Sequence, residues 1–362
     1  GEAVINKNFA AIDKALENLK KVYYPDKASG KPEYGFSISN NASDFTKNVL
    51  QKIISGEGDD LPVSAFPPDG TYPTATTKWE KRNIAELVPV WDEELCTQCN
   101  KCVIICPHAA IRAKIYDKDL LSKSPEGFKH VAPIGKDYDK EKEVYSLQVA
   151  VEDCTGCNLC IEVCPVESKE IPGTYAINMY DRLSIVDHEK KNWDFFFNLP
   201  EMNRERVNMT SVKGTQFLQP LFEFSSACSG CGETPYLKIL TQLFGDRMVV
   251  ANATGCSSIY GANLPTTPWT KNKEGLGPAW ANSLFEDNAE FGLGIKLAYD
   301  HRRDSALSVL KKMSSDLGDT LVNNILANDE STEHGIKLQH EYILELNKKL
   351  NELFSDDAKR LL

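Results

Sequence analysis

Long apolar runs are absent from this 362-residue sequence, in which no stretch approaches the roughly 18 apolar residues of a membrane span. A signal peptide with a basic start and an apolar core is lacking too. Positive charge is in deficit, because the formal net charge is −11, and this argues against a general nucleic-acid-binding surface. We therefore expect a cytoplasmic protein that binds neither membranes nor nucleic acids.

A complete dinucleotide-binding fingerprint is also missing. Gly292 and Gly294 form G-x-G, but no third glycine follows at the required spacing after a strand, so we expect no nucleotide binding there. The hydrophobic content of 41% is sufficient for ordinary buried cores, and the length suggests two or three domains. The sequence thus predicts a folded protein of several domains.

Cysteine is what the sequence does have: there are 11, all between Cys96 and Cys256. An odd number cannot form a closed disulfide framework. Eight of them form two runs with the spacing C-x2-C-x2-C-x3-C-P. The first run is Cys96, Cys99, Cys102 and Cys106, followed by Pro107, and the second is Cys154, Cys157, Cys160 and Cys164, followed by Pro165.

This spacing is the one with which bacterial ferredoxins hold [4Fe–4S] clusters. Three thiolates on a tight loop wrap one face of a cubane, and the fourth points toward the other cluster. The predicted ligands of cluster 1 are Cys96, Cys99, Cys102 and Cys164, and those of cluster 2 are Cys106, Cys154, Cys157 and Cys160. Structural zinc is the competing interpretation, but zinc sites rarely use four cysteines within a run of 11 residues.

The 47 residues between the two runs form a longer insert than a minimal ferredoxin has. Charged and turn-forming residues such as Lys118, Gly127 and Asp137 predict that this insert lies on the surface. His108 follows the first run and could tune a cluster through a hydrogen bond, although a packing role is commoner for such a histidine.

The remaining cysteines, Cys228, Cys231 and Cys256, form an incomplete set in the segments SSACSGCGETPY and ANATGCSSIYG. A cubane needs four ligands, so either the three bind something three-coordinate or a fourth cysteine lies outside this chain. Thr234 and Pro235 predict the N-cap and first position of a helix.

That helix has its apolar residues at Leu237, Leu240, Leu243 and Phe244, and Gly245 would end it. Residues 247–252 then predict a short buried strand that leads to Cys256. A helix, a strand and a glycine-containing loop form an α/β unit, in which ligands bind at the carboxyl ends of the strands. Cys256 is therefore expected beside a cofactor.

Further strings accompany these motifs: LPVSAFPPDGTYP and KWEKRNIA lie upstream, and LFEDNAEFGLG lies downstream. In this order, the motifs over about residues 40–300 closely resemble those of pyruvate:ferredoxin (flavodoxin) oxidoreductase. The resemblance implies an enzyme of anaerobic metabolism that uses thiamine diphosphate with Mg²⁺ and three [4Fe–4S] clusters. It would oxidise pyruvate with coenzyme A to acetyl-CoA and CO2 and pass electrons to ferredoxin or flavodoxin. Such enzymes are usually homodimers.

The resemblance also implies roles for individual residues. Cys228, Cys231 and Cys256 would be three ligands of the cluster nearest thiamine, with the fourth ligand outside this chain. Glu233 and Cys256 would lie beside thiamine diphosphate, although an acid such as Glu233 is also favourable near a helix N-terminus without any cofactor. No catalytic residue is assigned.

The G-D-G-W string with which this family holds magnesium and pyrophosphate is absent, and the chain begins at Gly1. We therefore expect a fragment that cannot turn over pyruvate by itself. Two alternatives stay open: an electron-transfer module without thiamine chemistry, and a relative that acts on another 2-oxo acid or is fused to a flavin reductase.

The expected fold class is α+β and α/β with several domains. Residues 1–34 include an amphipathic helix, with Phe9, Ile12, Leu16 and Leu19 at helical spacing, and resemble the tail of a preceding domain. Residues 35–86 would form a small linking domain and 87–200 a two-cluster ferredoxin-like domain. Residues 201–362 would be the first part of an α/β thiamine-diphosphate-binding domain, with an amphipathic helix at 336–354.

Overall fold

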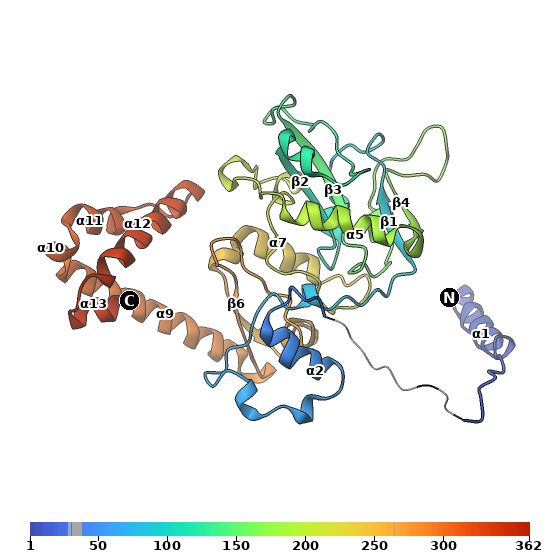
Figure 1. Ribbon diagram of the computed structural model, residues 1–362, viewed down its shortest axis with the longest axis horizontal. Coiled ribbons are helices and arrows are strands. Elements are labelled where there is room, and N and C mark those ends of the chain that lie inside the picture. Colours follow the sequence, from blue (N-terminus) through green and yellow to red (C-terminus); the bar gives the residue numbers. More distant parts are fainter. Residues whose placement is uncertain (28–29, 31–37, 264) are drawn as a thin grey trace. The chain divides into compact units, whose positions relative to one another are not determined.

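A computed structural model describes residues 1–27, 30, 38–263 and 265–362 and divides the chain into two units, Gly1–Ser37 and Ile38–Leu362. The first unit contains α1 (Glu2–Glu17), which confirms the predicted helix (Figure 1). Its apolar residues Phe9, Ile12 and Leu16 are 61–70% exposed, and no residue of α1 is buried. Leu19 lies beyond the end of the helix. The expected boundary between residues 34 and 35 lies outside the described residues.

The second unit begins with short helical turns. In chain order these are η1 (Thr46–Leu50), α2 (Gln51–Ile54), η2 (Gly58–Asp60), η3 (Val63–Ala65) and η4 (Thr77–Trp79). The backbone of this segment is tied to a distant part of the chain, because Ala75 N–H donates to the Trp269 carbonyl at 2.7 Å and Thr76 N–H to the Thr267 carbonyl at 3.1 Å.

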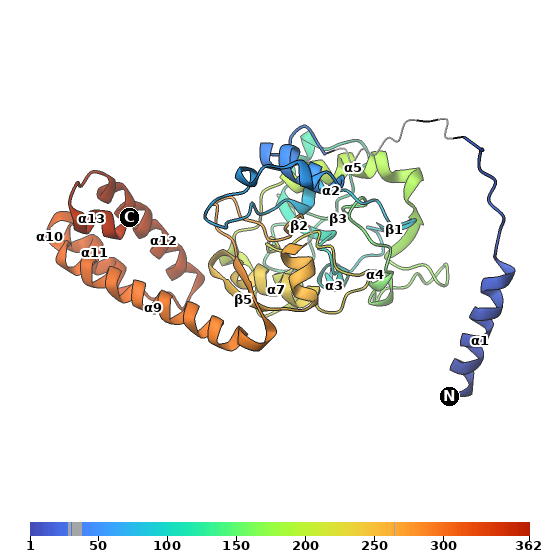
Figure 2. The ribbon, with the colours of Figure 1, turned by 90° about the horizontal axis from the view of Figure 1, so that it is seen from below.

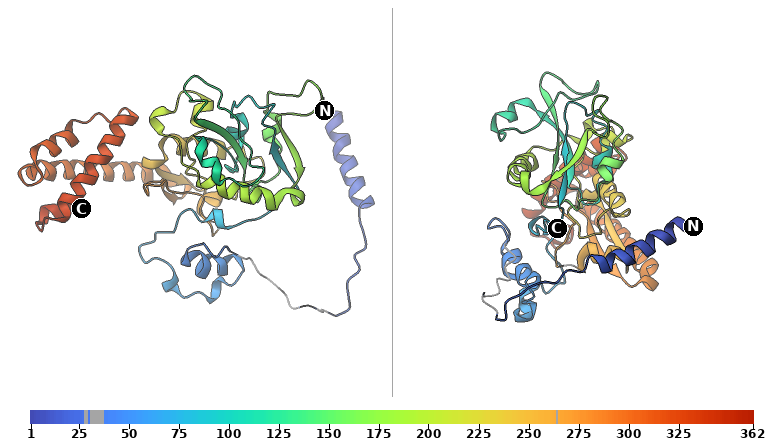
Figure 3. Two further views of the ribbon diagram at one scale, coloured as in Figure 1. Left: turned by 45° about the horizontal axis from the view of Figure 1, so that its top comes forward. Right: turned by 90° about the vertical axis from the view of Figure 1, so that its right-hand side faces the viewer.

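Two antiparallel strand pairs organise the next region (Figures 1 and 3). β1 (Leu87–Trp91) pairs with β4 (Ile177–Asp181), and β2 (Ile111–Asp117) pairs with β3 (Glu143–Val149). The accompanying helices are α3 (Lys101–Ile105), η5 (Lys118–Lys123), α4 (Leu159–Glu162) and α5 (Arg182–Asn198). Trp91, Tyr145 and Phe196 are buried in the shared core, and α5 packs against β3.

The insert between the cysteine runs is only partly a surface feature, so that prediction was wrong for its two ends. β2 and β3 are buried almost throughout, whereas Lys118, Gly127 and Asp137 in their connection are exposed. The reason is that the insert forms a hairpin whose charged residues find partners inside: Lys114 donates to the Leu199 carbonyl at 2.8 Å and pairs with Glu201 at 2.6 Å.

The α/β unit around Cys256 has the predicted order of elements. The elements of this region are η6 (Arg204–Arg206), α6 (Val212–Thr215), α7 (Thr234–Phe244), η7 (Gly245–Arg247), β5 (Val249–Ala253), α8 (Cys256–Ser258), η8 (Ile259–Asn263), β6 (Ala279–Ser283) and η9 (Phe285–Asp287). β5 pairs with β6 in parallel. The strand starts two residues later than predicted, and it is partly exposed rather than buried.

The orientation of α7 corrects the sequence interpretation. The helix ends before Gly245 as predicted, but Thr234 is its first residue and Glu233 occupies the N-cap position. The buried residues of α7 are the polar ones, Thr234, Lys238, Thr241 and Gln242, while Leu240 and Phe244 are exposed. The polar face is buried because Lys238 donates to backbone carbonyls of the cysteine-bearing region and Gln242 to the Leu218 carbonyl.

Helices make up the rest of the chain (Figure 2). They are α9 (Asn288–Lys312), α10 (Ser314–Leu317), α11 (Asp319–Ala327), α12 (Glu333–Asn351) and α13 (Asp356–Leu361). They share a separate apolar core that includes Leu310, Leu321 and Leu350. α12 confirms the helix predicted near 336–354, with Leu346 buried. Among the described residues, no helix has both the length and the apolar character needed to cross a membrane.

Candidate metal-cluster site

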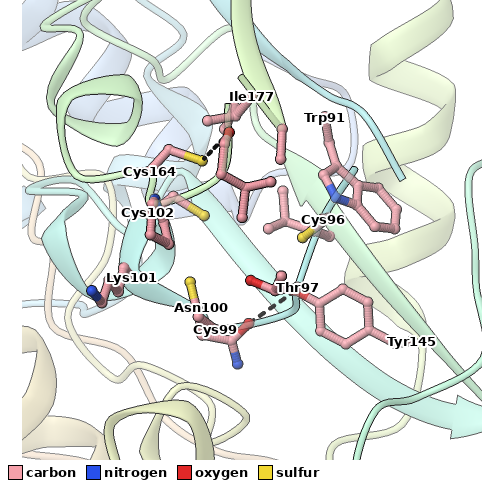
Figure 4. Close-up of a pocket in the computed structure, with 14 residues that line it drawn as sticks. Trp91, Cys96, Thr97, Cys99, Asn100, Lys101, Cys102, Tyr145, Cys164 and Ile177 are labelled. Atoms are coloured by element: carbon pink, nitrogen blue, oxygen red, sulfur yellow. Dashed lines mark hydrogen bonds between the residues drawn. The ribbon is translucent and has the colours of Figure 1, made fainter. Parts of the chain in front are cut away.

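The first cavity gathers three cysteines of the first run and the last cysteine of the second. Cys96, Cys99, Cys102 and Cys164 line it together, beside Trp91 and Tyr145. Figure 4 shows the four sulfur atoms turned toward one common space. The structure therefore brings together the four residues that the sequence assigned to cluster 1.

The second cavity has the reciprocal composition. Its cysteines are Cys106 from the first run and Cys154, Cys157 and Cys160 from the second, and Pro107 and His108 also line it. These are the residues assigned to cluster 2. The run that supplies three thiols to one cavity thus supplies one to the other.

The same backbone turn shapes both loops. Gln98 and Asn100 in the first loop, and Gly156 and Asn158 in the second, have φ between 56° and 67°, the left-handed region. These positions lie two and four residues after the first cysteine of each run. The turn directs backbone N–H groups at sulfur: Gln98 N–H donates to Cys96 Sγ at 3.3 Å, and Gly156 N–H to Cys154 Sγ at 3.4 Å.

Side chains hold the first loop in this conformation. Gln98 Nε2 donates to the Ala132 carbonyl at 2.8 Å, and Asn100 Oδ1 accepts from the Tyr145 hydroxyl at 2.9 Å. In the second loop, a Cβ at position 156 would lie 3.2 Å from the Leu87 carbonyl oxygen, so glycine is favoured there by space as well as by its positive φ.

The chemistry of these thiols fits a cationic ligand. Burial raises the pKa of Cys154 and Cys160 to about 12, and that of Cys102 well above its usual value, with nearby thiolates as a further cause for Cys160 and Cys102. Four thiolates side by side are unfavourable unless metal ions compensate their charge. In the described part of the chain, no three His, Cys, Asp or Glu side chains are arranged to hold a single metal ion; the thiols instead surround a space.

The third set of cysteines is more open. Cys228 and Cys256 are exposed and Cys231 is half-buried. The loop of residues 228–231 lies on the second run, because Ser229 Oγ donates to the Thr155 carbonyl at 3.1 Å and a Cβ on Gly230 would lie 3.7 Å from Cys157 Cβ.

Tyr260 connects the members of this set. Burial raises the pKa of the Tyr260 hydroxyl above its usual value, and the negative charges of Glu233, Cys231 and Cys256 raise it further. Glu233 itself is exposed at the start of α7, and Cys256 follows the carboxyl end of β5 as expected. Glu233, Cys231 and Cys256 thus all lie near enough to Tyr260 to act on its hydroxyl electrostatically.

Buried polar residues that the sequence did not single out join the cysteine-bearing region to the segment after it. Arg112 on β2 forms a buried ion pair with Glu223 and donates through Nε to the Ala109 carbonyl at 2.9 Å. Lys238 on α7 reaches the carbonyls around the end of α3. No local spacing marks these contacts, because Glu223 lies 111 positions from Arg112 and Ile104 lies 134 positions from Lys238.

His108 lies at the same boundary. Its Nδ1 is 2.9 Å from the Ser225 carbonyl oxygen, and its own carbonyl accepts from Phe224 N–H at 2.8 Å. Burial lowers the pKa of His108 to about 4, so the ring is neutral near pH 7. His108 is therefore packed at this boundary, where it also lines the second cavity.

Comparison with known proteins assigns a class to the cysteine-bearing region. Residues 95–168 match the family model of the 4Fe-4S dicluster domain, and residues 32–85 match EKR, a domain of unknown function. The chain therefore contains a 4Fe–4S dicluster domain of the ferredoxin type, within a structure of mixed helices and strands.

Whole-chain similarity is more specific. The chain is 51% identical over 360 residues to pyruvate-flavodoxin oxidoreductase of a Nostoc species, and 49% identical over 357 residues to a probable pyruvate-flavodoxin oxidoreductase of Escherichia coli. These matches cover 98% of this chain and 30% of each relative. Pyruvate:ferredoxin oxidoreductase of Moorella thermoacetica is 46% identical over 312 residues, 86% of this chain and 26% of that protein.

The chain is thus homologous, along nearly its whole length, to one segment of the pyruvate-flavodoxin oxidoreductases, which confirms the resemblance seen in the motifs. It spans about 30% of the length of the relatives from Nostoc and Escherichia coli.

Proposed function

We propose that this chain forms the electron relay and one wall of the thiamine site of a pyruvate:ferredoxin (flavodoxin) oxidoreductase. In that enzyme, pyruvate and coenzyme A give acetyl-CoA and CO2, and two electrons leave one at a time for ferredoxin or flavodoxin. The observation that carries the proposal is the pair of cavities, each lined by four cysteines from both runs. The names of the relatives supply the reaction.

The proposed ligands are those grouped in the cavities: Cys96, Cys99, Cys102 and Cys164 for cluster 1, and Cys106, Cys154, Cys157 and Cys160 for cluster 2. Four thiols spread around a space suit a group of several atoms better than one ion. Bound [4Fe–4S] clusters supply one-electron acceptor sites. The protein contributes the thiolates, backbone N–H donors to sulfur, and apolar walls such as Trp91 that limit the access of water.

Contacts within the chain support an order for the relay. The loop of residues 228–231 touches the Cys154–Cys160 run, so electrons from the third cysteine set would reach cavity 2 before cavity 1. Residues 102–106 carry one thiol into each cavity and form the short covalent connection between them. Cavity 1 is then the exit toward the acceptor protein.

For the third set we propose that Cys228, Cys231 and Cys256 bind a third cluster together with a ligand from outside these residues. Glu233 and Cys256 would face thiamine diphosphate, which is bound with Mg²⁺ in the complete enzyme. The shared influence of Glu233, Cys231 and Cys256 on Tyr260 supports this grouping. The α/β order of α7, β5 and β6 supports a thiamine-binding domain that begins here. A homodimer and a reducing, cytoplasmic location complete the proposal.

Metal analysis tests this function. After anaerobic reconstitution with iron and sulfide, the chain is expected to hold about eight iron atoms and eight sulfides, the content of two cubanes. Stoichiometric zinc, or iron without acid-labile sulfide, would contradict the proposal. The exposure of Cys228 and Cys256 favours the second candidate, an electron-transfer module without thiamine chemistry. Quenching of tryptophan fluorescence by added thiamine diphosphate and Mg²⁺ would argue against that candidate.

A further inference from the structure

A buried lysine links α7 to the backbone between the two cysteine cavities. Lys238 is only 1% exposed. Its Nζ donates to the carbonyl oxygens of Val103, of Ile104 at 2.9 Å and of Cys106 at 3.1 Å. Val103 and Ile104 belong to the end of α3. Cys106 follows the helix, and its side chain lines cavity 2.

The three contacts indicate an ammonium group. A charged lysine has three N–H donors and a neutral one has two, so three accepting carbonyls match the charged form. The carbonyls at the end of a helix are also its partially negative end, which favours a cation. Lys238 therefore brings a positive charge into the interior beside residues 102–106.

Among the described residues, Lys238 forms no ion pair with a carboxylate, and its Nζ contacts backbone carbonyls instead. Burial lowers the pKa of Lys238 to about 8. The negative charges of Cys106 and Cys102 raise this pKa, and the positive charge of Arg112 lowers it further. Cys102 lines cavity 1 and Cys106 lines cavity 2. One cation thus interacts with a predicted ligand of each cluster.

Lys114 is a second buried lysine, and its hydrogen-bond partners are different from those of Lys238. It donates to the Leu199 carbonyl at 2.8 Å near the end of α5, and it forms an ion pair with Glu201 at 2.6 Å. The charged groups that act on its pKa are Glu201, Arg112 and Lys273, with no cysteine among them. Both lysines are buried, but Lys238 donates to the carbonyl of a cavity cysteine, Cys106, whereas Lys114 donates to the carbonyls of Phe197 and Leu199.

We propose that Lys238 is a positioning and potential-setting residue of the relay: it fixes residues 102–106 and raises the reduction potential of both clusters. The inference rests on the proposed function. Each cluster gains one negative charge when it takes up one electron, and a nearby buried cation stabilises that reduced form more than the oxidised one. Removal of the cation therefore makes both clusters harder to reduce.

Redox titration of the reconstituted full chain, followed by electron paramagnetic resonance, tests this inference. Lys238→Met keeps the length and apolar stem of the side chain but removes the charge, and both midpoint potentials are expected to shift to more negative values. Lys114→Met is the matched control, expected to leave both potentials at wild-type values. Lys238→Arg retains the charge and the donors, and should keep the potentials near those of the wild type.

The outcomes separate the inference from the proposed function. A wild-type chain that assembles no cluster overturns both. A fully loaded Lys238→Met chain with wild-type potentials overturns the inference alone, as does an equal negative shift in Lys114→Met. Should Lys238→Met fail to assemble clusters, Lys238→Arg decides: normal loading with wild-type potentials supports the role of the charge, and failure like that of the methionine variant refutes it.

Discussion

The eight cysteines of the two runs are buried or half-buried, whereas Cys228 and Cys256 of the third set are exposed. In each ferredoxin-type cavity, four thiols from this chain surround one space, and the loops that carry them are fixed by hydrogen bonds. The third set has three thiols on two loops with open surroundings. The difference indicates that the two cavities are complete within this chain, and that the third set depends on further groups to be enclosed.

The largest expected effect concerns the exchange of ligands between the runs. Cys164→Ser removes a thiolate from cavity 1, although the other three cysteines of its run line cavity 2. The cluster held by Cys96, Cys99 and Cys102 should be lost or become labile, and iron content should fall by about half. Iron and sulfide analysis with electron paramagnetic resonance measures this.

Cys256→Ser is the control, expected to leave both clusters of the runs intact. Loss of the cluster held by Cys154, Cys157 and Cys160 in the Cys164→Ser chain, with the other retained, would show that the runs do not exchange ligands.

Thiol reactivity should separate the two regions almost as strongly. Exposed Cys228 and Cys256 are expected to react with iodoacetamide at pH 8 at least about 100-fold faster than Cys154 and Cys160. In the reconstituted chain the latter two are enclosed in cavity 2 and, as proposed, bonded to iron, so their sulfur atoms are not available to the reagent. Mass spectrometry of quenched time points on the anaerobic, reconstituted chain gives the rates, and equal labelling would remove the contrast between the two regions.

A pH effect is expected at the boundary between the regions, at His108. Its pKa is lowered by burial from 6.5 to about 4, so the unfolded chain binds the proton more readily between these values. The contribution to stability is present above pH 6.5 and is lost as the pH falls toward 4. Between pH 7 and pH 5 the loss should be about 2 kcal/mol.

His108→Asn keeps a donor near the position of Nδ1 but does not titrate. Urea titrations measure the unfolding free energy at pH 7 and at pH 5. The loss between these two pH values should be about 2 kcal/mol smaller in this variant than in the wild type. An identical pH dependence in both chains would exclude His108 as the source.

The smallest expected effect concerns the loop turns. Gly156→Ala places a Cβ 3.2 Å from the Leu87 carbonyl oxygen at a φ of +67°, and should lower the unfolding free energy by about 1–2 kcal/mol. Gly232→Ala, in the open loop of the third set, has no atom within 4 Å of the added Cβ and should change it by less than about 0.5 kcal/mol. Denaturant titrations compare the two, and equal losses would show that the cavity loops are no more constrained than the open one.

Features with a local cause could be predicted from the sequence. The spacing within each run predicted a tight loop with three thiols on one side, and the rule for two-cluster ferredoxins then predicted which four residues would share each cavity. Helices α1 and α12 followed from apolar periodicity. These predictions required no knowledge of the rest of the chain.

Features with a distant cause could not be predicted. The apolar spacing of α7 did not show that its polar residues Lys238 and Gln242 would be the buried ones, because their partners, Ile104 and Leu218, lie on other segments of the chain.

The insert was predicted to lie on the surface from charged and turn-forming residues such as Lys118 and Asp137. Its strands are nevertheless buried, because Glu223 and Glu201 compensate the charges of Arg112 and Lys114 in the interior. Ion pairs between residues far apart in the sequence leave no periodic pattern in the sequence itself.

The reciprocal supply of cysteines has a mechanical consequence. If the thiolates bind as proposed, each cluster joins residues 96–106 to residues 154–164 through metal–sulfur bonds, as two cross-links would. The hairpin between the runs is then a loop whose two ends are linked, and this link reduces the conformational entropy of the unfolded chain. Oxygen damage to one cluster would therefore loosen both halves of the domain, so assembly of the metal centres and folding of the domain are a single event.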